Sequence, residues 1–226
     1  MKNTYYHRRK YHPMAQNSKQ RLGNSVFSMG PYTVELAARK RLAKDICELT
    51  FTRPQNFQFI PGQYIRFHFQ GLERDYTLVG ARDDSRISIC VERFENQGFL
   101  ARLFKCKPGQ RHEISGPYGH FIYRPGRRPS VFVGTGTGVA PFAGFAASGV
   151  SGYILLQGAR QSQDLIYREC LEKNSKTYVP CLSRDPGAAS AFQGHVTQYL
   201  DQVLSRGEYR FYICGGRQMI QDAWAL

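Results

Sequence analysis

The sequence predicts two domains of different class, an antiparallel β-barrel followed by an α/β domain built on a parallel sheet. Short runs of alternating apolar and polar residues, separated by turn signals, fill the first half of the folded chain. After Gly126 the pattern changes to strands that alternate with helices, which is typical of a parallel sheet with crossover connections. A glycine-rich stretch follows the first of these later strands, at the end of the sheet where such folds bind ligands.

The sequence predicts a basic flexible tail over residues 1–28. They are rich in Lys, Arg, Tyr, Asn and Gln and have no apolar periodicity. Six of the 31 basic residues precede the first acidic one, Glu35, so the remaining 25 basic and 17 acidic residues leave a net charge of +8. Such a surface favours acidic partners, but nucleic acid or anionic lipid would fit the number equally well. Charge alone therefore does not choose a partner.

Residues 29–125 predict the barrel. Ile65, Phe67 and Phe69 alternate with polar residues, and so do Ile87, Ile89 and Val91. Turn signals such as Pro61-Gly62 and Gly116-Pro117 separate these runs. One helix is expected inside this domain, over Gly98–Lys105, where Phe99, Leu100, Leu103 and Phe104 form an apolar side.

Residues 126–226 predict the α/β domain, with the boundary between the two domains at Arg124–Pro129. The expected strands lie near residues 130–134, 152–157, 177–182 and 209–214. The expected helices lie near residues 138–147, 164–172, 194–205 and 216–225. The alternation implies a parallel sheet covered by helices.

Composition argues against a membrane-spanning, secreted or metal-binding protein and sets the expected location. No run of 18 apolar residues exists and the N-terminus is polar, so neither a transmembrane helix nor a signal peptide is expected. The six cysteines form no C-x-x-C pair or iron–sulfur spacing, and the six histidines form no ligand cluster. We therefore expect a cytoplasmic protein with reduced thiols and no metal site.

The glycine-rich stretch lies within Val131–Phe142 and predicts a pyrophosphate cradle. Gly134, Gly136 and Gly138 leave the backbone amides uncovered, and the helix that follows points its positive end at the same place. The spacing matches neither the G-x-G-x-x-G fingerprint nor the phosphate loop with its lysine. A glycine-rich turn that binds no ligand remains the alternative.

Two further stretches carry groups suited to a cofactor. Arg74, Tyr76 and Thr77 offer a phosphate fork, an aromatic plane and a hydroxyl, although an ordinary strand would also contain Tyr and Thr. Cys214 ends an apolar strand before Gly215, and we expect it beside the glycine loop because carboxyl ends of parallel strands meet at one edge. A small buried core cysteine is the alternative.

In this order the stretches resemble landmarks of the ferredoxin–NADP reductase superfamily, over about residues 32–224. Arg74–Thr77 resembles its R-x-Y-[ST] flavin motif, and Gly116–Phe121 resembles its G-P-x-G-x-F motif. Gly134–Pro141 resembles its nicotinamide-nucleotide loop. The later landmarks are Gly158–Arg160 with Asp164–Tyr167, then Leu182–Arg184, and Cys214–Gly216 with Met219.

The resemblance implies a Greek-key barrel that binds FAD and a Rossmann-like domain that binds NAD(P). It implies that Arg74 contacts the FAD pyrophosphate, that Tyr76 stacks on the isoalloxazine, that Thr77 reaches toward flavin N5 and that Cys214 lies near the nicotinamide. The expected catalytic residues are Tyr76, Thr77 and Cys214. The residues expected to bind FAD or the nucleotide are Arg74, Tyr76, Thr77, Val91, Gly98, Gly116, Gly134, Thr135, Gly136, Thr137, Gly138, Arg160, Ser183, Arg184, Cys214 and Gly215.

The implied activity is hydride transfer between NAD(P)H and FAD, with single electrons passed to or from a separate carrier. An acidic ferredoxin or flavodoxin would suit the basic surface, and no nucleic acid is expected. The alternatives are a reductase component of a multi-component oxygenase or other redox complex, and a catalytically incomplete flavin-binding subunit. Ser183 and Arg184 match the family's 2′-phosphate pair, which favours NADPH while NADH stays open.

Two departures from the family pattern stand out. The family usually has Gly-x-x-Ser at the barrel helix, whereas Gly98–Ala101 lacks the hydroxyl, so that backbone amides or Arg102 would have to substitute. The sequence ends at Leu226 inside the last expected helix, where relatives continue for about one more strand. The nucleotide sheet is therefore expected to lack its final strand and to expose an edge that allows association.

Overall fold

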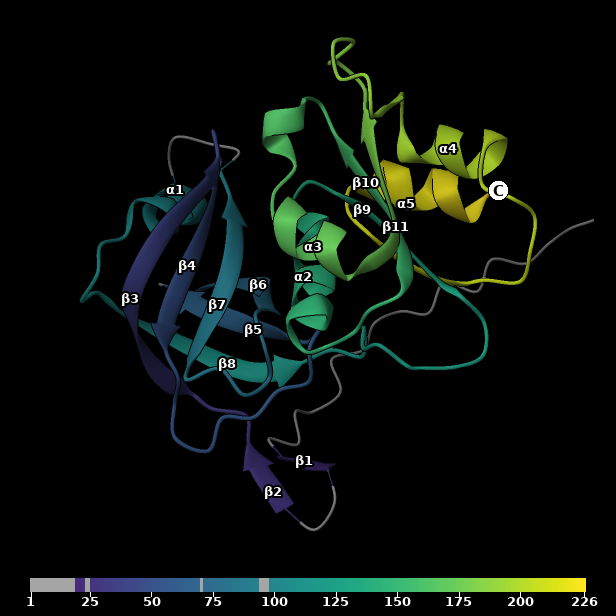
Figure 1. Cartoon of the computed structure of the whole chain (residues 1–226). Coiled ribbons are helices and arrows are strands. Elements are labelled where there is room, and N and C mark those ends of the chain that lie inside the picture. The colour runs from purple at the N-terminus through teal and green to yellow at the C-terminus, as the bar shows by residue number, and fades with distance from the viewer. Residues whose placement is uncertain (1–18, 23–24, 70, 94–97) are drawn as a thin grey trace, which may run out of the picture.

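The chain folds into a β-barrel and an α/β unit that pack side by side (Figure 1). This computed structural model describes residues 19–22, 25–69, 71–93 and 98–226. Within the stretch expected to be a basic tail, β1 (Lys19–Leu22) and β2 (Ser25–Ser28) pair as an antiparallel hairpin. The remainder of that predicted tail lies outside the described residues.

Six antiparallel strands close the barrel in the order β3-β4-β7-β6-β5-β8, which confirms the predicted fold class of the first domain. They are β3 (Tyr32–Ala43), β4 (Ile46–Thr52), β5 (Tyr64–Phe69), β6 (Leu72–Val79), β7 (Arg86–Glu92) and β8 (Arg111–Tyr118). Helix α1 (Gly98–Lys105) lies across one end of the barrel, as the sequence predicts.

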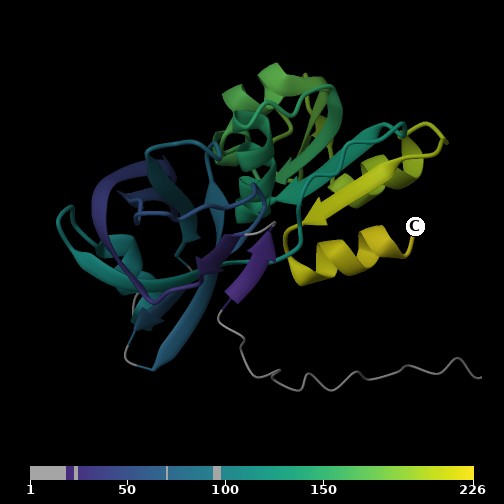
Figure 2. The same ribbon diagram turned by 90° about the horizontal axis from the view of Figure 1, so that it is seen from below.

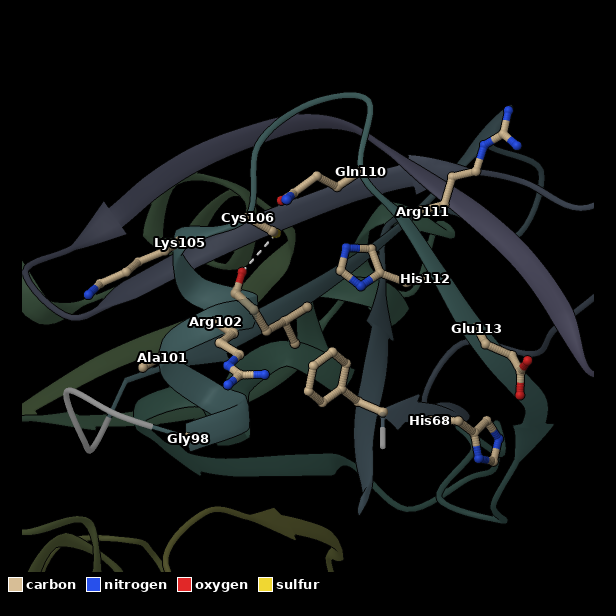
Figure 3. Close-up of a pocket in the computed structure, with 12 residues that line it drawn as sticks. His68, Gly98, Ala101, Arg102, Lys105, Cys106, Gln110, Arg111, His112 and Glu113 are labelled. Carbon is tan, nitrogen blue, oxygen red and sulfur yellow. Dashed lines mark hydrogen bonds between the residues drawn. The ribbon is translucent and has the colours of Figure 1, made fainter. Parts of the chain in front are cut away.

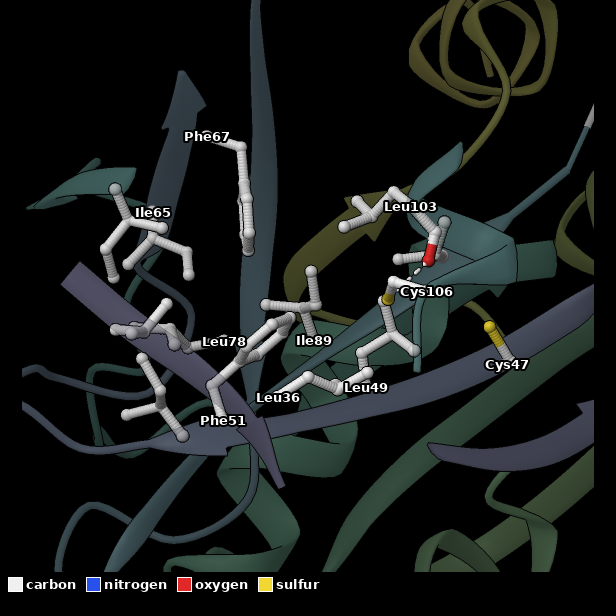
Figure 4. Packing of buried hydrophobic residues seen from close by; sticks show 14 of the residues in the cluster. Leu36, Cys47, Leu49, Phe51, Ile65, Phe67, Leu78, Ile89, Leu103 and Cys106 are labelled. Atoms are coloured by element: carbon white, nitrogen blue, oxygen red, sulfur yellow. Dashed lines mark hydrogen bonds between the residues drawn. The ribbon is translucent and has the colours of Figure 1, made fainter. Parts of the chain in front are cut away.

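The barrel core follows the predicted alternation. Ile65, Phe67, Ile87, Ile89 and Val91 are all 1% exposed or less, because every second residue of a half-buried strand points inward. These side chains form one cluster with Leu103 and Cys106, which belong to α1 and the turn after it; Figure 4 labels Ile65, Phe67 and Ile89 of this cluster. The helix therefore closes the open end of the barrel with its apolar side.

The α/β unit has a five-stranded parallel sheet in the order β12-β11-β10-β9-β13. Its strands are β9 (Ser130–Thr135), β10 (Tyr153–Ala159), β11 (Ser175–Leu182), β12 (Phe192–Gln193) and β13 (Arg210–Cys214). The short β12 has no counterpart in the sequence prediction. Its helices are the 3-10 turns η1 (Gly136–Val139) and η2 (Ser162–Asp164), then α2 (Ala140–Ala147), α3 (Arg168–Asn174), α4 (Val196–Gln202) and α5 (Arg217–Trp224).

Helices cover both faces of this sheet. The side of the sheet toward the barrel packs on α2 and α3, and the opposite side packs on α4 and α5 (Figure 2). The expected helix over residues 164–172 is wrong in its first turn, since α3 begins only at Arg168. Leu165 and Ile166 enter the core at 7% and 3% exposure, and Tyr167 adopts a left-handed conformation at φ 58°. A residue in the left-handed conformation interrupts a right-handed helix, so α3 starts only after Tyr167.

One of three hydrophobic clusters in the described part of the chain joins the two units. Ile46, Val79 and Cys90, from the outer face of the barrel, join a cluster with Phe132 and Phe142 of the α/β unit. The end of β6 also packs against α2, where a Cβ on Gly144 would lie 3.3 Å from the carbonyl oxygen of Leu78. This junction places the end of β7 beside the turn that follows β9, at the carboxyl ends of the parallel strands.

Candidate functional site

Strands β6 and β7 pair over only two residues and separate at one end of the closed barrel. β6 pairs with β5 along Leu72–Thr77, but with β7 only through Leu78 and Val79. β7 pairs along its whole length with β4 on its other side. The two strands therefore separate beyond Leu78 and leave one backbone edge of β6 without a strand partner in the described part of the chain. Such an edge can hydrogen-bond a ligand.

Arg74, Tyr76 and Thr77 lie along this open edge. The Arg74 guanidinium is exposed and its Nη1 donates to the carbonyl oxygen of Glu73 at 2.9 Å. The Tyr76 ring meets Phe67 edge to face at 5.7 Å, and its hydroxyl is buried with no hydrogen-bond partner among the described residues. Burial raises the pKa of that hydroxyl, which therefore stays protonated at neutral pH. A buried hydroxyl without a partner fits a position that a bound polar group completes.

A pocket of about 790 Å³ lies between α1, the end of β5 and the start of β8 (Figure 3). Gly98, at the start of α1, has φ +84° and open space where a Cβ would be. Arg102, one helical turn further, lies over the ring of Phe69 with its Cζ 5.2 Å from the ring centroid. Ala101 lines the same pocket, so the family's missing hydroxyl leaves apolar surface there, with a guanidinium beside it.

The glycine loop packs closely on the turn that follows β13. A Cβ on Gly138 would overlap the carbonyl oxygen of Cys214 and lie 2.5 Å from the Cα of Gly215. Gly136 adopts φ +54°, a conformation that favours glycine. Thr135 joins the loop to the next one, since its Oγ1 accepts from the Gly216 amide at 3.4 Å. The geometry of a tight turn between a buried strand and a helix N-terminus suits a diphosphate.

Cys214 lies beside this loop, as the sequence predicts. It pairs with Gly134 in the register of β13 and β9, so both strands end at the same level. The side chain is half-buried, and burial raises the pKa of its thiol, which stays protonated at neutral pH. The thiol therefore presents a small uncharged group at the edge of the sheet.

Three other predicted residues gather at the ends of β10 and β11. The Arg184 amide donates to the carbonyl oxygen of Arg160 at 2.9 Å, and Ser183 donates to Ala159 at 3.2 Å. Asp185 is held by the amide of Ser162 at 2.9 Å and by its hydroxyl. Among the described residues Arg184 forms no ion pair with Asp185. The side chains of Arg160 and Arg184 are both exposed at the rim of the sheet.

Val91 and Gly116 lie apart from this group. Val91 is fully buried in the barrel core, so only its backbone faces the β6–β7 opening. Gly116 lies on β8, which β5 separates from β6, and a Cβ there would lie 3.2 Å from the carbonyl oxygen of Tyr64. Its close packing on β5 gives it a structural role at that position.

The structure adds residues that the sequence reasoning missed. Glu92 ends β7 opposite the glycine loop, and a Cβ on Gly136 would lie 3.7 Å from its Oε2. Tyr167 donates its hydroxyl to Glu48 Oε2 at 2.8 Å across the junction of the two units, and it also bonds the Cys90 thiol. No local sequence signal identifies these contacts, because each joins residues that are far apart in the chain.

No described helix is long and apolar enough to cross a membrane, and the described residues contain no cluster of three or more metal-ligating side chains. All six cysteines are free thiols.

Comparison with known proteins identifies both units. Residues 33–123 match the family model for the oxidoreductase FAD-binding domain, and residues 132–224 match that for the oxidoreductase NAD-binding domain. Ferredoxin–NADP reductase B of Sorangium cellulosum is 31% identical over 191 residues, covering 76% of this chain and 78% of the relative. The electron transfer component of toluate 1,2-dioxygenase from Pseudomonas putida is 28% identical over 179 residues, covering 72% and 52%.

The chain thus spans about half the length of the dioxygenase component that it matches. Among solved structures, the ferredoxin NADP⁺ reductase of Neisseria gonorrhoeae, with bound FAD and NADP, superposes with a TM-score of 0.76. It is 20% identical, and the match covers 86% of this chain and 89% of that one, which establishes the shared fold.

Proposed function

Since the chain belongs to the ferredoxin–NADP reductase superfamily and carries its FAD-binding and NAD-binding domains, we propose that it is a reductase that links a nicotinamide nucleotide to a separate redox protein. In this role it moves a hydride between NAD(P)H and FAD, and single electrons to or from the partner. The observation that carries the proposal is the junction at which the end of β7, next to the unpaired edge of β6, lies against the glycine loop.

The residues of the open edge fit FAD. Arg74 offers an exposed guanidinium for the diphosphate, and Tyr76 offers an aromatic face together with a hydroxyl that lacks a partner within the described chain. Thr77 offers a hydroxyl on β6, next to Leu78, whose carbonyl oxygen lies against Gly144 of α2. When bound, FAD accepts the hydride and releases single electrons. The contribution of these residues is to orient the ring system and to exclude water from one face.

The rim of the α/β sheet supports a preference for NADPH. Arg160, Ser183 and Arg184 gather at the carboxyl ends of β10 and β11, where the ribose of a dinucleotide reaches in such sheets. A 2′-phosphate suits two exposed guanidinium groups better than a ribose hydroxyl does. Specificity constants for the two nucleotides test this proposal, and equal or NADH-favouring values would contradict it.

The partner proposed here is an acidic electron carrier such as a ferredoxin or flavodoxin. A net charge of +14 supports electrostatic steering of such a partner. A reductase component of an oxygenase system is the second candidate, favoured by the toluate dioxygenase relative. Steering predicts that electron transfer slows as the Debye length falls from about 30 Å at 0.01 M to about 10 Å at 0.1 M salt. A rate that ignores salt over this range would count against an acidic carrier.

Two further features belong to this proposal. Free thiols fit a reducing compartment, which supports a cytoplasmic location. Strand β13 lies at one edge of the described sheet, with Phe211 45% exposed, which supports association with another chain through this edge.

The proposal is tested by the absorption spectrum of the purified chain after reconstitution with FAD. Under anaerobic conditions, addition of NADPH should bleach the oxidised flavin band. A protein that binds FAD but stays oxidised with both nucleotides would instead be a flavin-binding subunit, and the proposal would be wrong.

A further inference from the structure

The carboxylate of Glu92 faces the loop that is best suited to bind an anion. Glu92 is the last residue of β7 and reaches across the junction to Gly136, where a Cβ would lie 3.7 Å from its Oε2. Gly136 belongs to a turn whose amides and following helix favour negative charge. In the described part of the chain the Glu92 side chain has neither a hydrogen bond nor an ion pair within 4 Å.

The other charged groups around Glu92 come from two elements. Arg160, at the end of β10, faces it from the α/β unit and stabilises its negative charge. Asp45, in the turn before β4, opposes that charge, but Asp45 is itself held by Arg93 at 2.6 Å. The segment from Gly136 to Ala147, which packs on the far side, contains no charged residue. Glu92 is therefore the acidic group that reaches the loop from the barrel.

We propose that the Glu92 carboxylate competes with the diphosphate of a nicotinamide dinucleotide for the Gly134–Gly138 loop, which holds down nucleotide affinity and favours its release. The inference rests on the proposed function, because it assumes that a dinucleotide binds at this loop. Like charges a few ångströms apart at a partly buried site repel.

A pH dependence follows from the same geometry. Burial raises the pKa of Glu92 above its ordinary value, while Arg160 opposes the shift and Asp45 adds to it. As the pH falls through this raised pKa, the carboxylate is neutralised and the repulsion disappears. Nucleotide affinity should therefore rise toward acid and fall toward neutral pH. The Cys214 thiol, whose pKa is raised, remains uncharged throughout this range.

The experiment measures the dissociation constant of NADP⁺ for the FAD-loaded protein between about pH 5 and pH 8, in the wild type, in Glu92→Gln and in Glu208→Gln. Glu208 is an exposed carboxylate that pairs with Arg128 before β13, at the amino ends of the strands and thus on the opposite edge of the sheet from the loop. The Glu208→Gln substitution removes the same charge as Glu92→Gln, so it controls for the change in net charge. The ratio of wild-type to variant constants cancels the titration of the nucleotide's own phosphate, whose second pKa lies near about 6.

We expect Glu92→Gln to bind NADP⁺ roughly tenfold more tightly at pH 8, with the ratio falling toward one as the pH decreases, and Glu208→Gln to match the wild type. Equal affinity of wild type and Glu92→Gln across the range would overturn the inference. Weaker binding by Glu92→Gln would also overturn it, because the carboxylate would then accept a hydrogen bond from the nucleotide. Failure of the wild type to bind either nucleotide would instead refute the proposed function.

Discussion

Substitution of Tyr76 by Phe tests whether the open edge of β6 awaits a ligand. The Tyr76 hydroxyl is buried without a partner among the described residues, while its ring packs on Phe67. A buried hydroxyl that lacks a partner costs about 1–3 kcal/mol. Tyr76→Phe removes that cost and keeps the ring, so the FAD-free protein should gain about 1–2 kcal/mol of unfolding free energy. For a chain of this size the gain corresponds to about 2–8 °C in Tm.

A matched control is Tyr153→Phe. Tyr153 is also buried, but its hydroxyl donates to the carbonyl oxygen of Leu171 at 3.1 Å. The same substitution there removes a satisfied hydrogen bond and should lower the unfolding free energy by about 0.5–1.5 kcal/mol. The two variants should therefore change stability in opposite directions in urea denaturation followed by circular dichroism, with similar m-values.

The same two variants separate a ligand contact from a packing effect. If FAD bonds the Tyr76 hydroxyl, Tyr76→Phe should weaken FAD binding about fivefold to tenfold, although it stabilises the FAD-free protein. Tyr153→Phe should leave FAD affinity unchanged. A Tyr76→Phe protein that is less stable than the wild type without FAD would refute the reasoning, since the hydroxyl would then have a partner such as an ordered water.

Three other substitutions test separate parts of the site. Gly138→Ala places a Cβ against Cys214 and Gly215 and should weaken NADP⁺ binding at least tenfold. Gly187→Ala, which has open space around it, should leave NADP⁺ binding unchanged. Equal NADP⁺ affinity of the two variants would contradict the close packing of the loop. Arg102→Ala should raise the FAD dissociation constant about tenfold by loss of a charge-assisted contact, while Arg86→Ala, at the other end of β7, serves as the charge control. Tyr167→Phe loses the 2.8 Å hydrogen bond to Glu48 and should lower the unfolding free energy by about 1–2 kcal/mol in urea denaturation. FAD affinity should stay unchanged, and a drop in FAD affinity would instead give Tyr167 a direct role in the site.

Local sequence patterns predict correctly those features that are set within a single helix or strand. The alternation of Ile87, Ile89 and Val91 predicts a strand with one buried face, and all three are fully buried. The barrel and the parallel sheet are confirmed, and so are the superfamily and the FAD- and NAD-binding domains. Cys214 and the glycine loop meet because adjacent parallel strands must end at one edge, a rule that needs no knowledge of tertiary packing.

The same reasoning fails where two units meet. The segment Asp164–Tyr167 reads as the start of a helix, but Leu165 is buried and Ile166 joins the cluster between the two units. The Gln157 side chain also donates to the carbonyl oxygen of Ile166 at 2.9 Å. Tertiary contacts thus outweigh local helix propensity over these residues. Strand β12 is equally unpredictable, since its two residues form a strand only by pairing with Cys181 and Leu182.

Strand β7 shows why the site could not be completed from the sequence. Its inner face fills the barrel, which period-two alternation predicts, and the same pattern assigns Cys90 and Glu92 to solvent. Cys90 is instead 6% exposed, because the outer face of β7 packs on the α/β unit. Once Cys90 is buried in that junction, Glu92, two residues further on the same face, must also point toward the α/β unit. The position of this carboxylate opposite Gly136 is therefore a consequence of how the two units dock, and one strand carries both the wall of the flavin domain and a charge that faces the nucleotide loop.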